Sequence, residues 1–124
     1  MGLNRGDLVR QVNEASSVVL HEKGYISFVD VLLQIGKLTQ DNYEAWRLGN
    51  VHCLEEVISV NLAKVNHMLR ALHKNCRNGN LRPSKTAYVS WGKGPKRTLR
   101  FSKSGDPSIE DAYSTHFVRP KEGA

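Results

Sequence analysis

Cysteine is scarce in this sequence, which has two among 124 residues. Two cysteines cannot build the disulfide framework that stabilises many small secreted domains, so we expect a reducing, cytoplasmic compartment. No apolar run reaches the ~18 residues that a transmembrane helix needs, and the first residues lack the apolar stretch of a secretory signal. These absences predict a protein with no membrane segment and no disulfide framework.

Acidic residues are absent from residues 57 to 105, a segment that carries eleven lysines and arginines. Residues 1–56 hold eight acids against five bases, and residues 106–124 hold four acids against two bases. The overall net charge of +6 therefore conceals a strongly basic block. The usual partner of such a block is a polyanion such as DNA or RNA. The alternatives are an acidic protein partner and a basic face that only keeps the protein in solution.

The length is suited to one domain, which we place at residues 1–118, followed by a frayed tail at 119–124. Apolar residues recur at helical spacing in four N-terminal segments. We expect helices over 7–22, between Ser27 and Gly36, between Thr39 and Gly49, and over 51–75.

Two short segments of alternating apolar and polar residues, 86–91 and 98–101, predict a β-hairpin around a glycine-rich turn. The apolar faces match when either Val89 or Trp91 lies opposite Leu99, and the shorter loop favours Val89. In either register the same three residues lie on the outer face. They are Tyr88, Ser90 and Arg100.

A last helix is predicted after Ser104 and Gly105, with Asp106 as its N-cap and Pro107 in its first turn. Its inner face would hold Ile109, Ala112 and Tyr113, with His116 or Phe117 continuing it. The predicted fold class is thus α+β and predominantly α: a four-helix N-terminal part, then a β-hairpin and a C-terminal helix.

The hairpin and the second half of the 51–75 helix are the predicted nucleic-acid-binding surface. Their lysines and arginines would contact phosphates, with little reading of base sequence. Tyr88 could stack on a base beside Arg100. The predicted contact set is Tyr88, Lys93, Lys96, Arg97 and Arg100, with Lys74, Arg77, Arg82, Lys85 and Lys103 around them.

Residues 27–49 also have the pattern of a helix–turn–helix motif, in which the second helix would offer Gln40, Asn42 and Arg47 to bases. That helix carries Asp41 and Glu44 as well, and phosphates would repel both carboxylates. The segment is better interpreted as two helices that bury apolar side chains.

Evidence for an enzyme or a metal centre is thin. A small enzyme near residues 102–116 would use Ser104, Asp106 and His116, but no Gly-x-Ser-x-Gly motif supports it. Residues 100–107 could bind an anion at a helix N-terminus, although Asp106 would occupy the same amides. The His/Cys pairs 52–53 and 73–76 lie too far apart on one helix for a zinc site. We therefore predict no catalytic residues, no metal and no cofactor.

The stretches 88–95 and 99–107, together with 30–36 and 43–47, resemble small uncharacterised bacterial proteins of similar length. The resemblance covers about residues 24–118. It implies a bacterial cytosolic domain that stands alone, and it carries no function or site residue to this chain.

Overall fold

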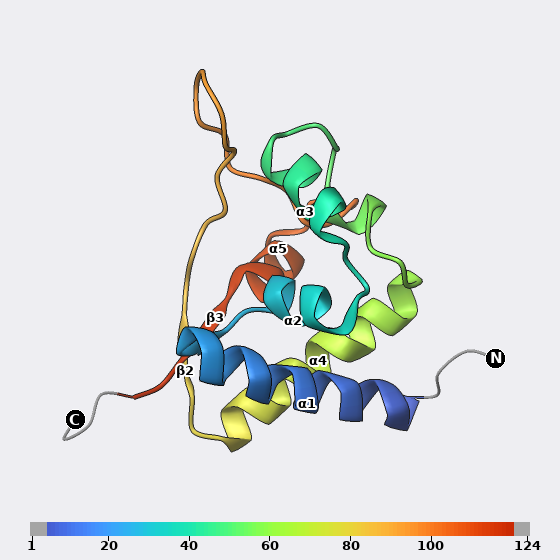
Figure 1. Cartoon of the computed structure of the whole chain (residues 1–124), viewed down its shortest axis with the longest axis vertical. Coiled ribbons are helices and arrows are strands. Elements are labelled where there is room, and N and C mark those ends of the chain that lie inside the picture. Colours follow the sequence, from blue (N-terminus) through green and yellow to red (C-terminus); the bar gives the residue numbers. More distant parts are fainter. Residues whose placement is uncertain (1–4, 121–124) are drawn as a thin grey trace.

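Five α-helices, one 3-10 helix and a small antiparallel sheet make up residues 5–120, the part of the chain that the computed structural model describes (Figure 1). The elements are α1 (Arg5–Lys23), β1 (Tyr25–Ile26), α2 (Phe28–Ile35), α3 (Gln40–Arg47), η1 (Leu54–Glu56), α4 (Leu62–Asn78), β2 (Arg82–Ser84), α5 (Pro107–Ser114) and β3 (His116–Val118). The fold class is α+β and predominantly α, as predicted. Of the predicted tail, residues 121–124 lie outside the described residues.

Helix ends that depend on neighbouring residues are confirmed. The Ser27 hydroxyl accepts a hydrogen bond from the Asp30 amide (3.0 Å), and Thr39 caps α3 in the same way. Gly36 ends α2 in the left-handed region, with a φ of 79°, where glycine adopts the conformation without strain. Asp106 accepts hydrogen bonds from two amides of the first turn of α5.

The predicted helix over 51–75 is wrong at its start. α4 begins at Leu62. The residue before it, Asn61, is its N-cap, because the Asn61 side chain accepts a hydrogen bond from the Lys64 amide (2.9 Å). Upstream, the Leu54 amide donates to the Arg100 carbonyl (3.1 Å), and the next amide donates to the carbonyl of Phe101 (2.9 Å). These tertiary hydrogen bonds replace a helical ladder there, although Leu54 is buried as the periodicity requires.

The strand β3 is the centre of a sheet whose order is β1-β3-β2, with both pairings antiparallel. Phe117 pairs with Ile26 on one side and with Pro83 on the other. The expectation that His116 or Phe117 continues the last helix is therefore wrong. Helical spacing and strand alternation both put Phe117 inside, so the pattern alone could not separate the two.

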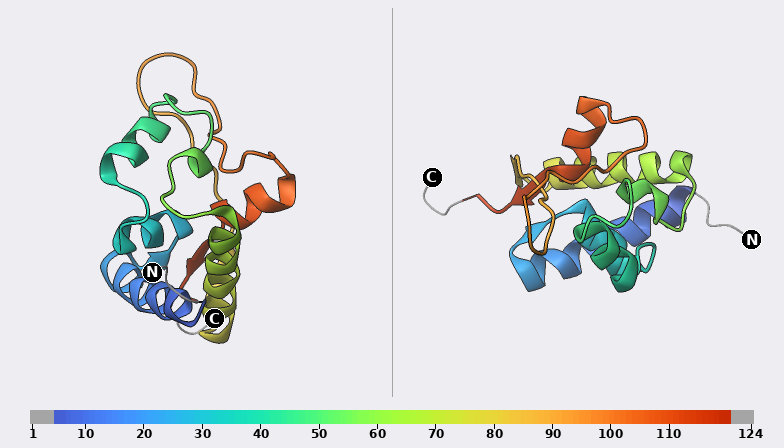
Figure 2. Two further views of the ribbon diagram at one scale, coloured as in Figure 1. Left: turned by 90° about the vertical axis from the view of Figure 1, so that its right-hand side faces the viewer. Right: turned by 90° about the horizontal axis from the view of Figure 1, so that it is seen from above.

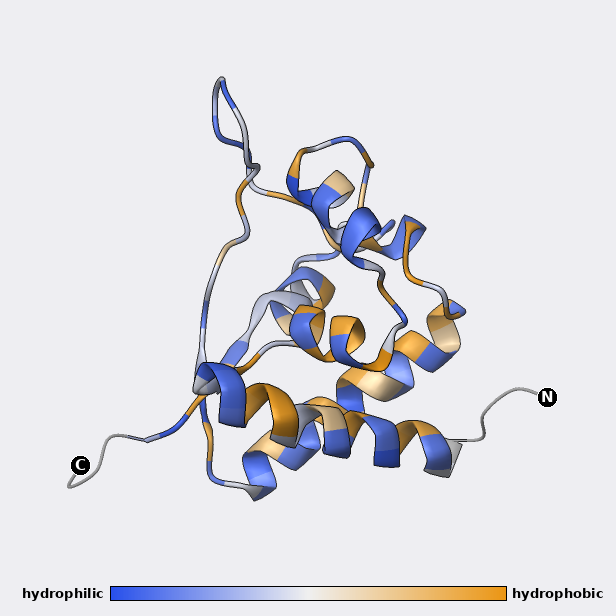
Figure 3. Cartoon of the chain, viewed as in Figure 1, coloured by the Kyte–Doolittle hydropathy of each residue, from blue (hydrophilic) through white to orange (hydrophobic). Residues whose placement is uncertain are grey.

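The core lies between α1, α2 and α4, with α5 and the sheet closing it. α1 crosses α4 and also packs against α2. Figure 2 shows the same arrangement from two other sides, and Figure 3 shows the concentration of apolar residues in α2. Within residues 5–120, no helix is both long and apolar enough to cross a membrane.

The hairpin (residues 86–101) is joined by a single bridge, Val89 to Thr98, and not in the predicted register. The Leu99 amide donates to the Tyr88 carbonyl at 2.7 Å. This one-residue shift turns Tyr88 inward, whereas Val89 and Trp91 face outward with 40% and 42% of their surface exposed. Leu99 is buried, as predicted. The first segment of the hairpin therefore presents the face opposite to the predicted one, whereas the second presents the predicted face.

Candidate nucleic-acid interface

The basic segment has almost no internal charge compensation. Of its eleven lysines and arginines, Lys85 alone has a carboxylate within 4.0 Å among the described residues. Its partner is Asp111, at 3.7 Å, and both side chains are well exposed. The other ten cations have no carboxylate partner within residues 5–120. Such a local excess of positive charge repels itself and attracts polyanions.

Three of these cations lie on the hairpin tip, which we define as residues 91–97. Lys93, Lys96 and Arg97 are all exposed. The turn contains Gly92 and Gly94, with φ values of 97° and 102° that other residues rarely adopt. Lys96 Nζ donates to the Gly92 carbonyl (2.8 Å), across the base of the turn. The tip projects beyond the helices at one end of the molecule (Figure 1).

Trp91 attaches the hairpin tip to α3. Its amide donates to the Arg47 carbonyl (2.6 Å). The Arg47 guanidinium carbon lies 4.7 Å from the centre of the Trp91 indole and 5.2 Å from the centre of the Tyr88 ring. The Tyr43 ring lies nearly perpendicular to the indole, with 5.7 Å between the ring centres. Arg47 is therefore held between two aromatic rings, which removes it from the role of reading bases from α3.

Tyr88 is not the exposed stacking residue that the sequence predicted. Its ring packs against Trp46 (5.5 Å) and Phe101 (5.4 Å), inside the hairpin. Its hydroxyl is 2.9 Å from Nε2 of His116. Trp91 occupies the exposed position instead. The signal for this in the sequence is its place directly before the run Gly-Lys-Gly-Pro, where few neighbours can cover an indole.

Arg100 holds the backbone beneath the hairpin. Its Nε donates to the Ser102 carbonyl (2.8 Å), and its Nη2 donates to the carbonyl of Lys103. The guanidinium also lies over Gly105, where an added Cβ would come within 2.8 Å of it. The half-buried Arg100 thus shapes the turn, whereas Lys103 and the tip cations remain exposed.

The proposed anion site at residues 100–107 is occupied by the chain's own carboxylates. Glu110 accepts hydrogen bonds from the Phe101 amide (2.9 Å), the Ser102 amide (2.7 Å) and the Ser102 hydroxyl (2.6 Å). Glu55 accepts one from the Lys103 amide (2.8 Å). Together with the Asp106 cap, these bonds use the donors that a phosphate would need. Of the two alternatives for residues 100–107, these hydrogen bonds favour the turn capped by Asp106 over the anion site.

His116 faces the aromatic cluster and not a serine. Besides its contact with the Tyr88 hydroxyl, its ring stacks on Tyr25 with 4.9 Å between centres. Burial lowers its pKa below the ordinary value. The Ser104 hydroxyl accepts a hydrogen bond from the Asp106 amide (3.2 Å), and the Asp106 carboxylate caps α5. Because His116 lies against Tyr88 and Tyr25, the predicted set of Ser104, Asp106 and His116 does not form a triad.

The two cysteines, Cys53 and Cys76, are free and buried. Burial raises the pKa of the Cys76 thiol to about 12, which disfavours the thiolate that a metal would require. In the described part of the chain, no three His, Cys, Asp or Glu side chains come together as metal ligands.

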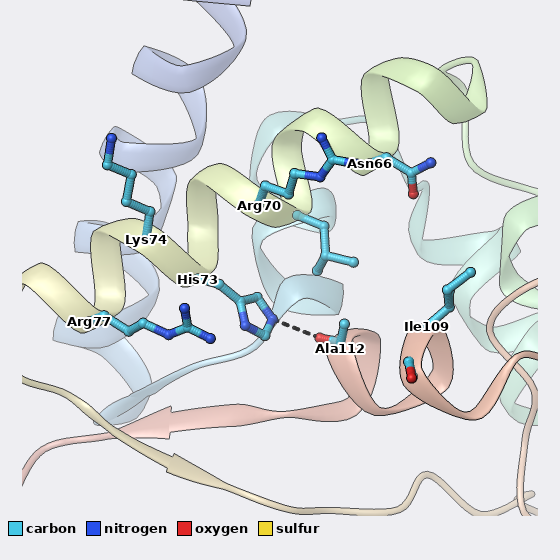
Figure 4. A pocket seen from close by; sticks show the side chains of 9 residues that line it. Asn66, Arg70, His73, Lys74, Arg77, Ile109 and Ala112 are labelled. Atoms are coloured by element: carbon cyan, nitrogen blue, oxygen red, sulfur yellow. Dashed lines mark hydrogen bonds between the residues drawn. The ribbon is translucent and has the colours of Figure 1, made fainter.

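A second cationic surface lies on α4. Arg70, Lys74 and Arg77 recur on one side of this helix and are exposed. They border a groove of about 470 Å³ between α4 and α5, with Leu69 and Ile109 among its apolar lining (Figure 4). Among the described residues, no acidic side chain lines this groove. In Figure 4, Arg77 extends toward His73, whereas Lys74 points away from α5.

The predicted contact residues therefore fall into separate groups. Lys93, Lys96 and Arg97 lie at the end of the molecule formed by the hairpin tip, and Lys74 and Arg77 lie on α4 at the opposite end (Figures 1 and 2). β2 and the extended segment that follows it run along the side between these ends (Figure 1). They carry the exposed Arg82 and Lys85.

The exposed face of α3 does not favour helix–turn–helix docking. Asp41 and Glu44 are exposed, and Gln40 Nε2 donates to the Glu44 carboxylate (3.0 Å). With Arg47 enclosed by rings, the helix presents a largely acidic and neutral surface.

No protein-family model, curated protein or solved structure matches the chain, so its own geometry carries the functional argument.

Proposed function

We propose that this protein is a nucleic-acid-binding module that contacts backbone phosphates through the hairpin tip. The observation that carries the proposal is the set of ten cations without carboxylate partners, three of them on a projecting turn. Phosphates would neutralise these cations and release condensed counterions, which provides most of the free energy of such binding.

Several predicted residues have a different role in this proposal. Arg100 and Tyr88 shape the hairpin from inside and support the tip without contacting phosphate. Lys103, Arg82 and Lys85 lie outside the tip and would add weaker, longer-range attraction. The free, buried cysteines are compatible with a cytoplasmic location, which is part of the proposal.

The test replaces Lys93, Lys96 and Arg97 by glutamine and measures affinity for a fluorescent oligonucleotide. The matched control replaces Arg70, Lys74 and Arg77, which removes the same formal charge from the opposite end. We expect the tip variant to lose affinity on the order of 100-fold at about 0.1 M salt, if each phosphate contact releases about 0.7 of a counterion. The control should lose far less. Equal losses in both variants would mean that net charge, and not the tip, attracts the ligand.

The groove between α4 and α5 favours a second candidate function, the docking of an acidic protein segment. Its apolar lining residues Leu69 and Ile109 could bury leucine side chains, and its cationic rim could pair with glutamates. The probe is an amphipathic helical peptide with leucines on one face and glutamates on the other. Its control is a peptide of the same composition in scrambled order. Binding that is lost in the α4 variant and kept in the tip variant would support this function. Equal binding of both peptides would exclude it.

A further inference from the structure

The chain has two tryptophans with opposite environments. Trp46 is 0% exposed and donates from Nε1 to the Arg100 carbonyl (2.8 Å). Trp91 has 42% of its surface exposed, although most of the apolar surface of a tryptophan is normally buried. The exposed indole is on the same short turn as three cations that have no carboxylate partner within residues 5–120. Aromatic surface beside positive charge is the combination that binds single-stranded nucleic acid.

The indole of Trp91 is held in place before any ligand arrives. One side carries the Arg47 guanidinium at 4.7 Å, and the Tyr43 ring lies nearly perpendicular to the indole with 5.7 Å between the ring centres. Arg47 is itself fixed against Tyr88, and its Nε is buried without a hydrogen-bond partner in the described residues. A cation on one side of an aromatic ring is a favourable contact. A base on the uncovered surface would extend the stack without ordering a mobile side chain, which lowers the entropic cost of binding.

The surroundings of Trp91 indicate which partner fits. Lys93, Lys96 and Arg97 follow within six residues, and no acid occurs between residues 57 and 105. This charge complements a phosphate backbone. A duplex keeps its base faces stacked on one another, whereas a single strand can present a face to an indole. Val89 and Leu48, which are 40% and 48% exposed, supply further apolar surface on the hairpin and at the end of α3.

We propose that the hairpin tip binds single-stranded nucleic acid and that Trp91 stacks on one of its bases. This inference rests on the proposed function and names its substrate class. The tip cations bind phosphates on either side of the stacked base, while Arg47 and Tyr43 act as positioning residues for the indole.

The experiment uses the full chain and a labelled single strand of about 12 thymidines, with a mixed-sequence duplex of the same length. Trp91→Leu keeps apolar bulk and removes the aromatic face, whereas Trp91→Phe keeps a smaller one. We expect Trp91→Leu to weaken single-strand binding roughly 5- to 150-fold and to leave duplex binding within about twofold. Trp91→Phe should recover part of the loss. Leu48→Ala is the matched apolar control and should change neither affinity by more than about twofold.

A second measurement needs no variant. Unlabelled single strand should quench the fluorescence of Trp91 saturably, while the buried Trp46 supplies a constant background. Duplex should quench far less. If wild type binds both ligands equally and Trp91→Leu changes neither, the stacking inference fails and phosphate binding stands. If Leu48→Ala costs as much as Trp91→Leu, the patch is a general apolar surface suited to a protein, and the inference fails. Failure of wild type to bind either oligonucleotide would overturn both proposals.

Discussion

Replacing Glu110 by alanine should destabilise the turn beneath the hairpin more than any neighbouring surface change. The carboxylate accepts three hydrogen bonds, from two amides and one hydroxyl of Phe101 and Ser102. Alanine leaves all three donors without this acceptor, in a region where both residues are buried. Each lost acceptor costs about 1–3 kcal/mol, and water reaches part of the site, so we take about 1 kcal/mol for each.

The expected loss in the free energy of unfolding is thus about 3 kcal/mol. A chain of 124 residues has an unfolding entropy of about 0.26 kcal/mol/K, at roughly 2.1 cal/mol/K per residue. The melting temperature should therefore fall by about 12 °C in a calorimetric scan.

Asp111→Ala is the matched control, because it removes the adjacent carboxylate of α5. Its ion pair with Lys85 spans 3.7 Å between exposed side chains, so the loss should stay below about 0.5 kcal/mol. A fall in melting temperature that is equal for the two variants would refute the claim that Glu110 occupies the turn as a structural anion.

Two further predictions concern pH and helix boundaries. Burial lowers the pKa of His116, so the unfolded chain binds a proton at this histidine more readily than the folded chain does. The neutral, half-buried histidine therefore supports the free energy of unfolding fully above pH 6.5. This support is lost as the pH falls from 6.5 through the lower pKa of the folded state. His116→Gln should flatten this pH dependence of the melting temperature, and an unchanged profile would assign it to other groups. Asn61→Ala removes the cap of α4 and should cost about 1 kcal/mol. Were the helix continuous from residue 51, alanine would instead be neutral or stabilising.

The sequence predicts those parts of the fold that depend on short-range signals. Ser27, Thr39 and Asp106 cap helices because each side chain meets amides two or three residues ahead. The start of α4 could not be predicted, because the amides of residues 54 and 55 pair with carbonyls of residues 100 and 101, at the end of the hairpin. The strands of the sheet were missed for a related reason: at two or three residues, they are too short to show alternation.

For the candidate site, composition predicted the cations and missed the aromatic residue. The absence of acids from 57 to 105 identified the basic segment, and the glycines located its turn. Trp91, and not Tyr88, is the exposed aromatic residue because the register of the hairpin differs by one residue from the predicted one. Such a shift reverses the face of every residue in a strand. The role of Arg100 depends on carbonyls presented by the folded turn, and no sequence pattern specifies those.

The salt dependence of binding tests the central claim most directly. If the hairpin tip contacts three phosphates of a single strand, the logarithm of the association constant should fall with the logarithm of salt concentration with a slope of about −2. In the variant with Lys93, Lys96 and Arg97 replaced by glutamine, the slope should approach zero. A slope that the three replacements leave unchanged, or no binding by the wild type at about 50 mM salt, would contradict the account.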